Sequence, residues 1–274
     1  MIEDIETFRS LIPTVAGNSL DKYLQPIEDA RVWLAGRIIG QEWLEEIEAM
    51  ERTSPLFLQT RLALAYKAYL LAIPMMDVLE TDNGFAVVAS DTLAPASRDR
   101  VAALTAAMGE NLNRALEHLV ESLQLPQHRD RWQGSPAGTA TAFSFFPSLR
   151  TFRLYSSFAG GYVNYMEAQP SIRRIILQHI EPRISRELSR QIIDQVQAGE
   201  LSAANGEIIE DLRMAVGSFF NGDAPAGESA LCRVREALEA NPENFPAFEN
   251  SALYRRLLQA AARKPEQGSI YVML

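Results

Sequence analysis

The chain has 274 residues, 47% of them hydrophobic and 22% charged, which is an ordinary composition for a folded globular protein. Its formal net charge of −9 argues against broad nucleic-acid binding, because such binding depends on neutralising phosphates. The single cysteine, Cys232, excludes an intrachain disulfide and a cysteine-based zinc cage, and we expect it to be buried and structural.

The first elements along the chain are predicted to be helices. From Ile27 to Ile47 apolar residues recur at steps of three and four, the pattern of an amphipathic helix, and Gly40 marks a bend or a junction within it. A second helix is predicted over residues 56–74, apolar on several sides and therefore central to the core.

The next stretch predicts a short β-hairpin within residues 76–89. Asn83-Gly84 supplies the positive φ values of a tight hairpin turn, and apolar residues flank it on both sides. A long helix follows over residues 96–125, with Ser97 as its cap and Pro126 at its end.

Proline, glycine and small polar residues then gather, which predicts a boundary in this region. We expect an N-terminal helical half with the hairpin (residues 1–132), a linker (133–148) and a C-terminal helical half (149–274). Helices of the second half are predicted over residues 169–198, split or kinked at Pro182, and over 204–220, 228–239 and 250–263. The fold class is therefore mostly α, with two helical-bundle halves.

The two halves share a short series of identities that indicates an internal duplication. Thr7-Phe8-Arg9 recurs as Thr151-Phe152-Arg153, and Pro26 recurs as Pro170. The series then continues, one residue later, with Ile39, Glu42 and Ile47 matching Ile184, Glu187 and Ile192. Chance likeness between amphipathic helices is the alternative, and the hairpin has no clear counterpart near Asn221-Gly222.

No pattern of catalytic or metal-binding residues is present. The three histidines are far apart in sequence, and no phosphate loop, nucleophile elbow or zinc-protease motif occurs. We therefore expect no catalytic residues, no metal and no cofactor, and a protein that is not an enzyme; a site built by shape alone remains the alternative.

Two segments stand out as candidate interfaces. Eight aromatic residues fall between Phe143 and Tyr165 with arginines among them, a composition that is enriched where proteins pack and that also stacks on single-stranded bases. Further along, arginines at i, i+3 and i+7 predict one basic helix face, with an ordinary solvated face as the alternative. The candidate interface residues are Phe143, Phe145, Phe146, Arg150, Phe152, Arg153, Tyr155, Arg183, Arg186 and Arg190.

Charge is unevenly distributed along the chain. Residues 1–135 hold 12 Lys and Arg against 20 Asp and Glu, whereas the remainder holds 14 against 15. Because the basic face of the second half and the acidic face of the first are complementary, head-to-tail self-association is one hypothesis. The acidic N-terminus and the interrupted apolar segment 62–79 predict neither a signal peptide nor a membrane span, so a cytoplasmic protein, or one assembled into a virion, is expected.

The sequence also carries a resemblance. Ile5-Glu-Thr-Phe8, Ile39-Gly40-x-Glu42-x-Leu44 and the stretch from Thr81 to Ser97 resemble an uncharacterised family encoded in prophage-like elements of gut bacteria. The short opening segment and the helix ending in Ile-Gly-x-Glu are loosely similar to head–tail connector (adaptor) proteins of tailed phages, which form rings beneath the portal. This chain departs from them in being about twice as long, so the resemblance implies neither a ring nor a subunit number.

The leading hypothesis is a non-enzymatic structural or assembly protein, resembling a phage or prophage head–tail connector component, whose partners are proteins: further copies of itself or phage structural proteins. The alternative is a ligand-binding helical module with a pocket between the halves, lined by residues 143–165. A third reading is a minor nucleic-acid binder that uses Arg173–Arg190.

Overall fold

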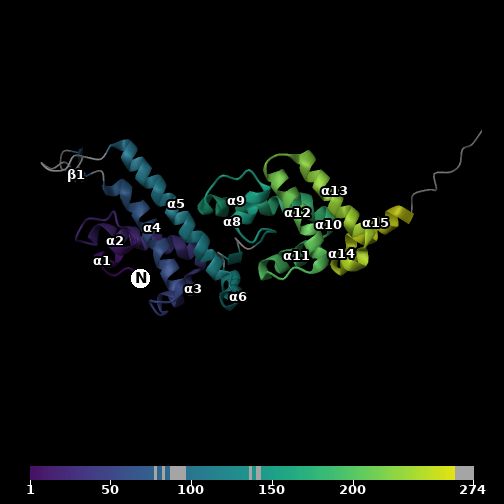
Figure 1. Cartoon of the computed structure of the whole chain (residues 1–274), viewed down its shortest axis with the longest axis horizontal. Coiled ribbons are helices and arrows are strands. Elements are labelled where there is room, and N and C mark those ends of the chain that lie inside the picture. Colours follow the sequence, from purple (N-terminus) through teal and green to yellow (C-terminus); the bar gives the residue numbers. More distant parts are fainter. Residues whose placement is uncertain (77–78, 82–83, 87–96, 136–137, 140–142, 263–274) are drawn as a thin grey trace, which may run out of the picture. The chain divides into compact units, whose positions relative to one another are not determined.

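The computed structural model describes residues 1–76, 79–81, 84–86, 97–135, 138–139 and 143–262, and it is mostly α-helical (Figure 1). The chain divides into two compact units. Unit 1 comprises Met1–Ala142 with Gly160–Glu167, and unit 2 comprises Phe143–Ala159 with Ala168–Leu274. Each unit has its own buried core and is described by itself.

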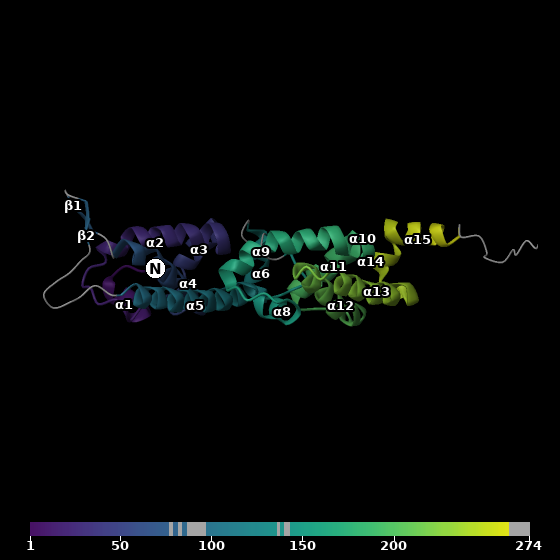
Figure 2. The same ribbon diagram turned by 90° about the horizontal axis from the view of Figure 1, so that it is seen from above.

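Unit 1 is built around one central helix, α4. Its elements are α1 (Ile5–Leu11), α2 (Asp21–Leu34), the π-helical turn η1 (Ala35–Ile39), α3 (Gln41–Glu48), α4 (Pro55–Met76), β1 (Leu79–Thr81), β2 (Gly84–Ala86), α5 (Arg98–Leu123) and α6 (Pro126–Gly134). Helix α4 packs against both α2 and α5 (Figure 2). Ser97 caps α5 by accepting from the Arg100 amide, as the sequence predicts.

The apolar character of α4 follows from its central position. Among the described residues it is the one helix long and apolar enough to cross a membrane by length and composition alone. Core helices of water-soluble proteins pass the same test, and the buried residues of α4, such as Phe57, Leu64 and Ala68, face other helices of unit 1.

The predicted hairpin region contains a three-residue ladder. β1 and β2 pair antiparallel, with Leu79 opposite Ala86 and Thr81 opposite Gly84. The turn residues 82–83 and the outer parts of the predicted hairpin lie outside the described residues. With strands this short, the fold class is simply mostly α.

Unit 2 has a similar series of elements. It contains α8 (Leu149–Tyr155), most of α9 (Tyr162–Ile175), the π-helical turn η2 (Ile176–Ile180), α10 (Glu181–Ile184), α11 (Arg186–Ala198), α12 (Ala203–Phe220), α13 (Ala224–Ala240), the 3-10 turn η3 (Pro242–Asn244), α14 (Pro246–Glu249) and α15 (Ala252–Ala262). Helix α12 packs against α8 and α13. Phe152 of α8 lies at the centre of an aromatic cluster, with Phe146 and Phe220 at ring-centroid distances of 5.0 Å and Phe158 at 5.6 Å.

The entry helices of the two units have matching local structure. The side chain of Asp4 accepts from the Thr7 amide at the start of α1, and Ser148 accepts from Thr151 at the start of α8. The next residues, Phe8 and Phe152, are both fully buried. Each following helix contains an internal proline, Pro26 in α2 and Pro170 in α9.

The match continues through a pair of unusual junctions. α2 and α9 both end in a five-residue π-helical turn, η1 and η2. The residue before the next amphipathic helix then has a positive φ: 92° at Gly40 before α3 and 79° at Ser185 before α11. Ile39 and Ile184, which precede these residues, are both fully buried. Unit 2 differs by one extra helical turn, α10, ahead of its junction.

Helix α5 ends before Pro126, as predicted, and Pro126 also begins α6, because the first turn of a helix needs no amide hydrogen from proline. Two local predictions were wrong. The break near Pro182 lies at Ser185, since Pro182 is in the first turn of α10 where proline is tolerated. Cys232 is exposed on α13, and its neighbours Leu231 and Val234 fill the core in its place.

The predicted linker 133–148 also differs from the structure. Gly134 still belongs to α6, whereas Phe145 and Phe146 are buried in the core of unit 2. Composition alone missed this, because glycine, serine and proline residues surround the two aromatic side chains.

Candidate functional site

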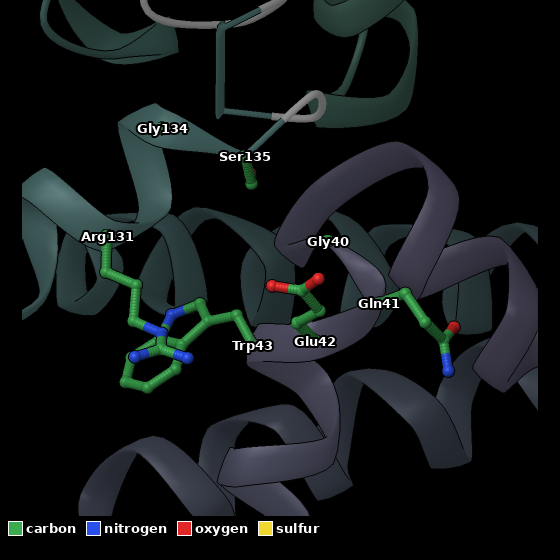
Figure 3. Close-up of a pocket in the computed structure, with 7 residues that line it drawn as sticks. All are labelled: Gly40, Gln41, Glu42, Trp43, Arg131, Gly134 and Ser135. Carbon is green, nitrogen blue, oxygen red and sulfur yellow. The ribbon is translucent and has the colours of Figure 1, made fainter.

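The candidate site is a cavity in unit 1 at the junction between η1 and α3, which we call the junction pocket. It has a volume of about 410 Å³, within the range of ligand pockets. It is lined by Gly40, Gln41, Glu42, Trp43, Arg131, Gly134 and Ser135 (Figure 3).

Gly40 is the residue that makes the junction possible. Its amide donates to the Ala35 carbonyl at 2.9 Å, which closes the π-helical turn, and its φ of 92° lies where glycine is favoured. A Cβ at this position would lie 2.8 Å from the Cβ of Ser135. The close approach of α6 therefore depends on glycine here.

Helix α6 forms the opposite wall because Trp132 fixes it to the π-helical turn. Trp132 is fully buried, and its indole Nε1 donates to the Ile38 carbonyl at 2.5 Å. This contact joins residues far apart in sequence and places Arg131 and Ser135 beside α3. Ser135 is held in turn by its own hydrogen bonds, since its hydroxyl donates to the Trp132 carbonyl and accepts from the Gly138 amide.

Trp43 is the aromatic residue of the pocket, and it is 7% exposed. The Arg131 guanidinium carbon lies 5.1 Å from its ring centroid, and Arg131 also pairs with Glu46. The His128 ring lies at 5.7 Å. The indole Nε1 of Trp43 is nevertheless buried without a hydrogen-bond partner among the described residues. In Figure 3 its nitrogen lies on the side of the ring next to the Arg131 side chain.

The chemistry of this pocket suits binding. Glu42 points across the open space toward Ser135, whereas Gln41 points away (Figure 3). No side chain caps α3, so the amides of its first turn face the same region. In the part of the chain that the structure describes, no group of three or more His, Cys, Asp or Glu residues is placed to hold a metal ion.

The structure divides the predicted basic face of unit 2. Arg183 lies on α10 and pairs with Glu228 of α13 at 3.0 Å. Arg186 and Arg190 lie on the other side of the Ser185 break, one turn apart on α11, and both are exposed. The single helix face expected for all three is therefore wrong, because the positive φ at Ser185 interrupts the helix.

A second cavity of about 300 Å³ lies beside Arg186, between the α10–α11 junction and α15. Glu181 lines it, and burial raises the pKa of this carboxyl although Arg186 and Arg190 act against the rise. One Glu181 carboxylate oxygen is buried without a partner among the described residues.

The predicted aromatic interface is mostly core. Phe145, Phe146 and Phe152 are buried, so they stabilise unit 2 and form no exposed surface. The Tyr155 hydroxyl donates to Glu210 of α12. Burial is the main cause that raises the pKa of Tyr155, and the hydrogen bond to Glu210 raises it further. The Arg173 guanidinium covers the Phe143 ring at 4.6 Å.

The exposed members of this segment lie on α8. They are Arg150 and Arg153, together with the neighbouring Leu154, which is 74% exposed.

Trp43 and Arg131 were not predicted as site residues. In the sequence Trp43 is simply one apolar position of an amphipathic helix, and Arg131 lies in a stretch of loop-like composition. The usable signals were the glycine directly after the buried pair Ile38-Ile39 and proline at position 126, where it can begin a helix.

A comparison with known families finds one match, to part of the chain. Residues 12–142 match the model of a family described as "Family of unknown function (DUF6712)". Every residue that lines the junction pocket falls within the matched region. No curated protein and no solved structure matches the chain.

Proposed function

We propose that this protein is a non-enzymatic assembly component that associates head to tail with further copies of itself. The observation that carries the proposal is the presence of opposite charges on exposed helices of different units. Glu42 and Glu45 are exposed on α3 of unit 1, beside Glu46, which pairs with Arg131. In unit 2 the exposed arginines Arg186 and Arg190 have no ion pair within the described part of the chain.

Electrostatic complementarity of this kind guides association and fixes its orientation. Residues 1–135 have an excess of eight acidic groups, so a neighbouring copy's basic patch is attracted over the range of a Debye length, about 10 Å at 0.1 M salt.

We further propose that the two units arose by duplication of one helical unit. The matched caps, internal prolines, π-helical turns and positive-φ junctions support this, because a π-helical turn followed by a positive φ is a rare combination. A duplicated unit whose copies carry different charges fits an assembly part with two different neighbours.

The finer assignment, a prophage-encoded protein similar to phage head–tail connectors, rests on the sequence resemblance. Under this proposal its partners include phage structural proteins, and the protein is made in the cytoplasm before assembly into a virion.

Sedimentation velocity at low and at high salt tests self-association. We expect concentration-dependent oligomers at low ionic strength that dissociate as salt screens the charged faces. A monomer at all salt and protein concentrations would contradict the proposal.

A further inference from the structure

The junction pocket contains a hydrogen-bond donor that lacks an acceptor. Trp43 is more than nine-tenths buried, and its indole N–H has no partner among the described residues. Buried donors are nearly always satisfied, so each exception calls for an explanation. Trp43 lines the junction pocket, so an oxygen atom of a group bound there can supply the missing acceptor (Figure 3).

The start of α3 adds further donors to the same place. Its capping position is Gly40, which has no side chain, whereas the matching residue of unit 2, Ser185, accepts from the Leu188 amide at 3.2 Å. Unit 2 therefore closes its helix start with its own hydroxyl, and unit 1 leaves the first turn of α3 open.

Charge decides which kind of acceptor enters. The carboxylate of Glu42 points into the pocket, and Glu45 and Glu46 are exposed on the same helix (Figure 3). A phosphate or carboxylate would meet this acidic surface and be repelled. A group that brings a cation together with a neutral oxygen acceptor meets both requirements.

Arg131 of this chain shows which kind of cation fits beside Trp43. The guanidinium of Arg131 lies over the Trp43 ring and pairs with Glu46. Glu42, the other carboxylate near this ring, has no ion-pair partner among the described residues, and it is free to receive a second guanidinium.

We infer that the junction pocket binds an extended, arginine-bearing segment of a protein partner. A main-chain carbonyl of the segment accepts from the Trp43 indole, and its arginine pairs with Glu42. A cavity of about 410 Å³ holds a few residues of such a segment. The inference goes beyond the proposed function: Arg186 and Arg190 of another copy lie on helix α11, so the extended segment belongs to a different protein partner.

Titration of ¹⁵N-labelled full-length protein with short peptides tests the inference by NMR. The probe is acetyl-Gly-Arg-Gly-amide, and the matched controls are the same peptide with glutamate or glutamine in place of arginine. We expect a saturable downfield shift of the Trp43 indole resonance, assigned with Trp43→Phe. The Trp132 indole already donates to Ile38, so its resonance serves as the internal reference and should not shift.

Two variants separate the pocket from the surrounding acidic face. Glu42→Gln should weaken binding of the arginine peptide about three- to fivefold, as expected for an exposed ion pair. Glu51→Gln, exposed beyond the end of α3 and outside the pocket lining, should leave the affinity unchanged.

A larger shift with the glutamate peptide or with inorganic phosphate would overturn the inference in favour of an anion site. No shift with any probe would overturn it as well. Sedimentation reports self-association independently, so a protein that oligomerises without binding the peptide disproves the pocket assignment alone.

Discussion

The two positive-φ residues define the chemistry of their junctions at the scale of single side chains. Gly40 has the conformation without strain and leaves room for Ser135. Ser185 is the one described non-glycine residue with a positive φ, and its hydroxyl caps α11. Both junctions therefore require a positive φ. In unit 1 a glycine adopts it without strain, and in unit 2 it is adopted by a serine whose hydroxyl caps the next helix.

Gly40→Ala should destabilise unit 1 by about 2 kcal/mol or more, because a side chain at this φ is strained and its Cβ would meet Ser135. Chemical denaturation measures the loss. Gly36→Ala is the matched control, since nothing lies within 4 Å of a Cβ there, and it should be close to neutral. Ser135→Gly should restore part of the lost stability; a Gly40→Ala protein as stable as wild type would disprove the account.

Ser185 allows a paired test of strain against capping. Ser185→Ala removes the cap and keeps the strain, so we expect a loss of about 1 kcal/mol. Ser185→Gly removes the strain and costs only a few tenths of a kcal/mol in capping, so we expect a gain of up to about 1 kcal/mol. Thermal unfolding of both variants checks the order. The two variants having the same stability would contradict it.

Glu181 gives a prediction about pH. Burial raises the pKa of this carboxyl in the folded protein above its ordinary value, so folding favours the protonated form. The contribution of Glu181 to stability is therefore fully present at pH values below the ordinary pKa of a glutamate. It is lost as the pH rises through the raised pKa of the folded state. At pH 7 Glu181→Gln should increase the free energy of unfolding by less than about 1 kcal/mol and melt at a higher temperature than wild type. The difference between the two proteins should shrink toward pH 4. A stability difference between the variant and wild type that stays constant from pH 7 to pH 4 would contradict this account of Glu181.

At the scale of elements, the aromatic residues after Phe143 pack α8 onto α12. Phe152 is fully buried and contacts the rings of Phe146, Phe158 and Phe220. Phe152→Ala should cost about 3–5 kcal/mol, whereas Leu154→Ala, at a position 74% exposed, should change stability by less than about 0.5 kcal/mol. Denaturation midpoints check both. Equal effects would mean that the cluster is not part of the core.

Most helices follow from apolar periodicity, and the long helix starting after Ser97 was predicted together with its cap. The π-helical turns were not predicted, because they depend on one extra residue per turn at a junction that the apolar pattern does not distinguish. The same holds for α6. Its role depends on the hydrogen bond from Trp132 to Ile38, a contact between distant parts of the chain that no local pattern contains.

The site was predicted less well than the fold. Sequence composition singled out aromatic residues and arginines as a candidate interface, yet burial separates Phe146 and Phe152 from any surface. Arg186 and Arg190 remain exposed candidates, whereas Arg183 is engaged by Glu228. Whether a side chain is core or surface depends on tertiary packing, so residue type alone could not decide it.

At the scale of the whole molecule, the proposal depends on charges that belong to different units. The acidic excess lies in residues 1–135, and the remainder is nearly neutral with exposed arginines on α11. Under the proposal, the molecule attracts its own copies in one orientation, acidic unit to arginine face, and the attraction weakens with salt.

Charge reversal on both faces tests this claim most directly by sedimentation velocity at low salt. Arg186→Glu with Arg190→Glu should give a monomer, and so should Glu42→Arg with Glu45→Arg, because each change places like charges on both faces. An equimolar mixture of the two variants should associate again, since the acidic faces of one variant then meet the basic faces of the other. Wild-type protein that stays monomeric, or charge variants that associate as wild type does, would contradict head-to-tail assembly.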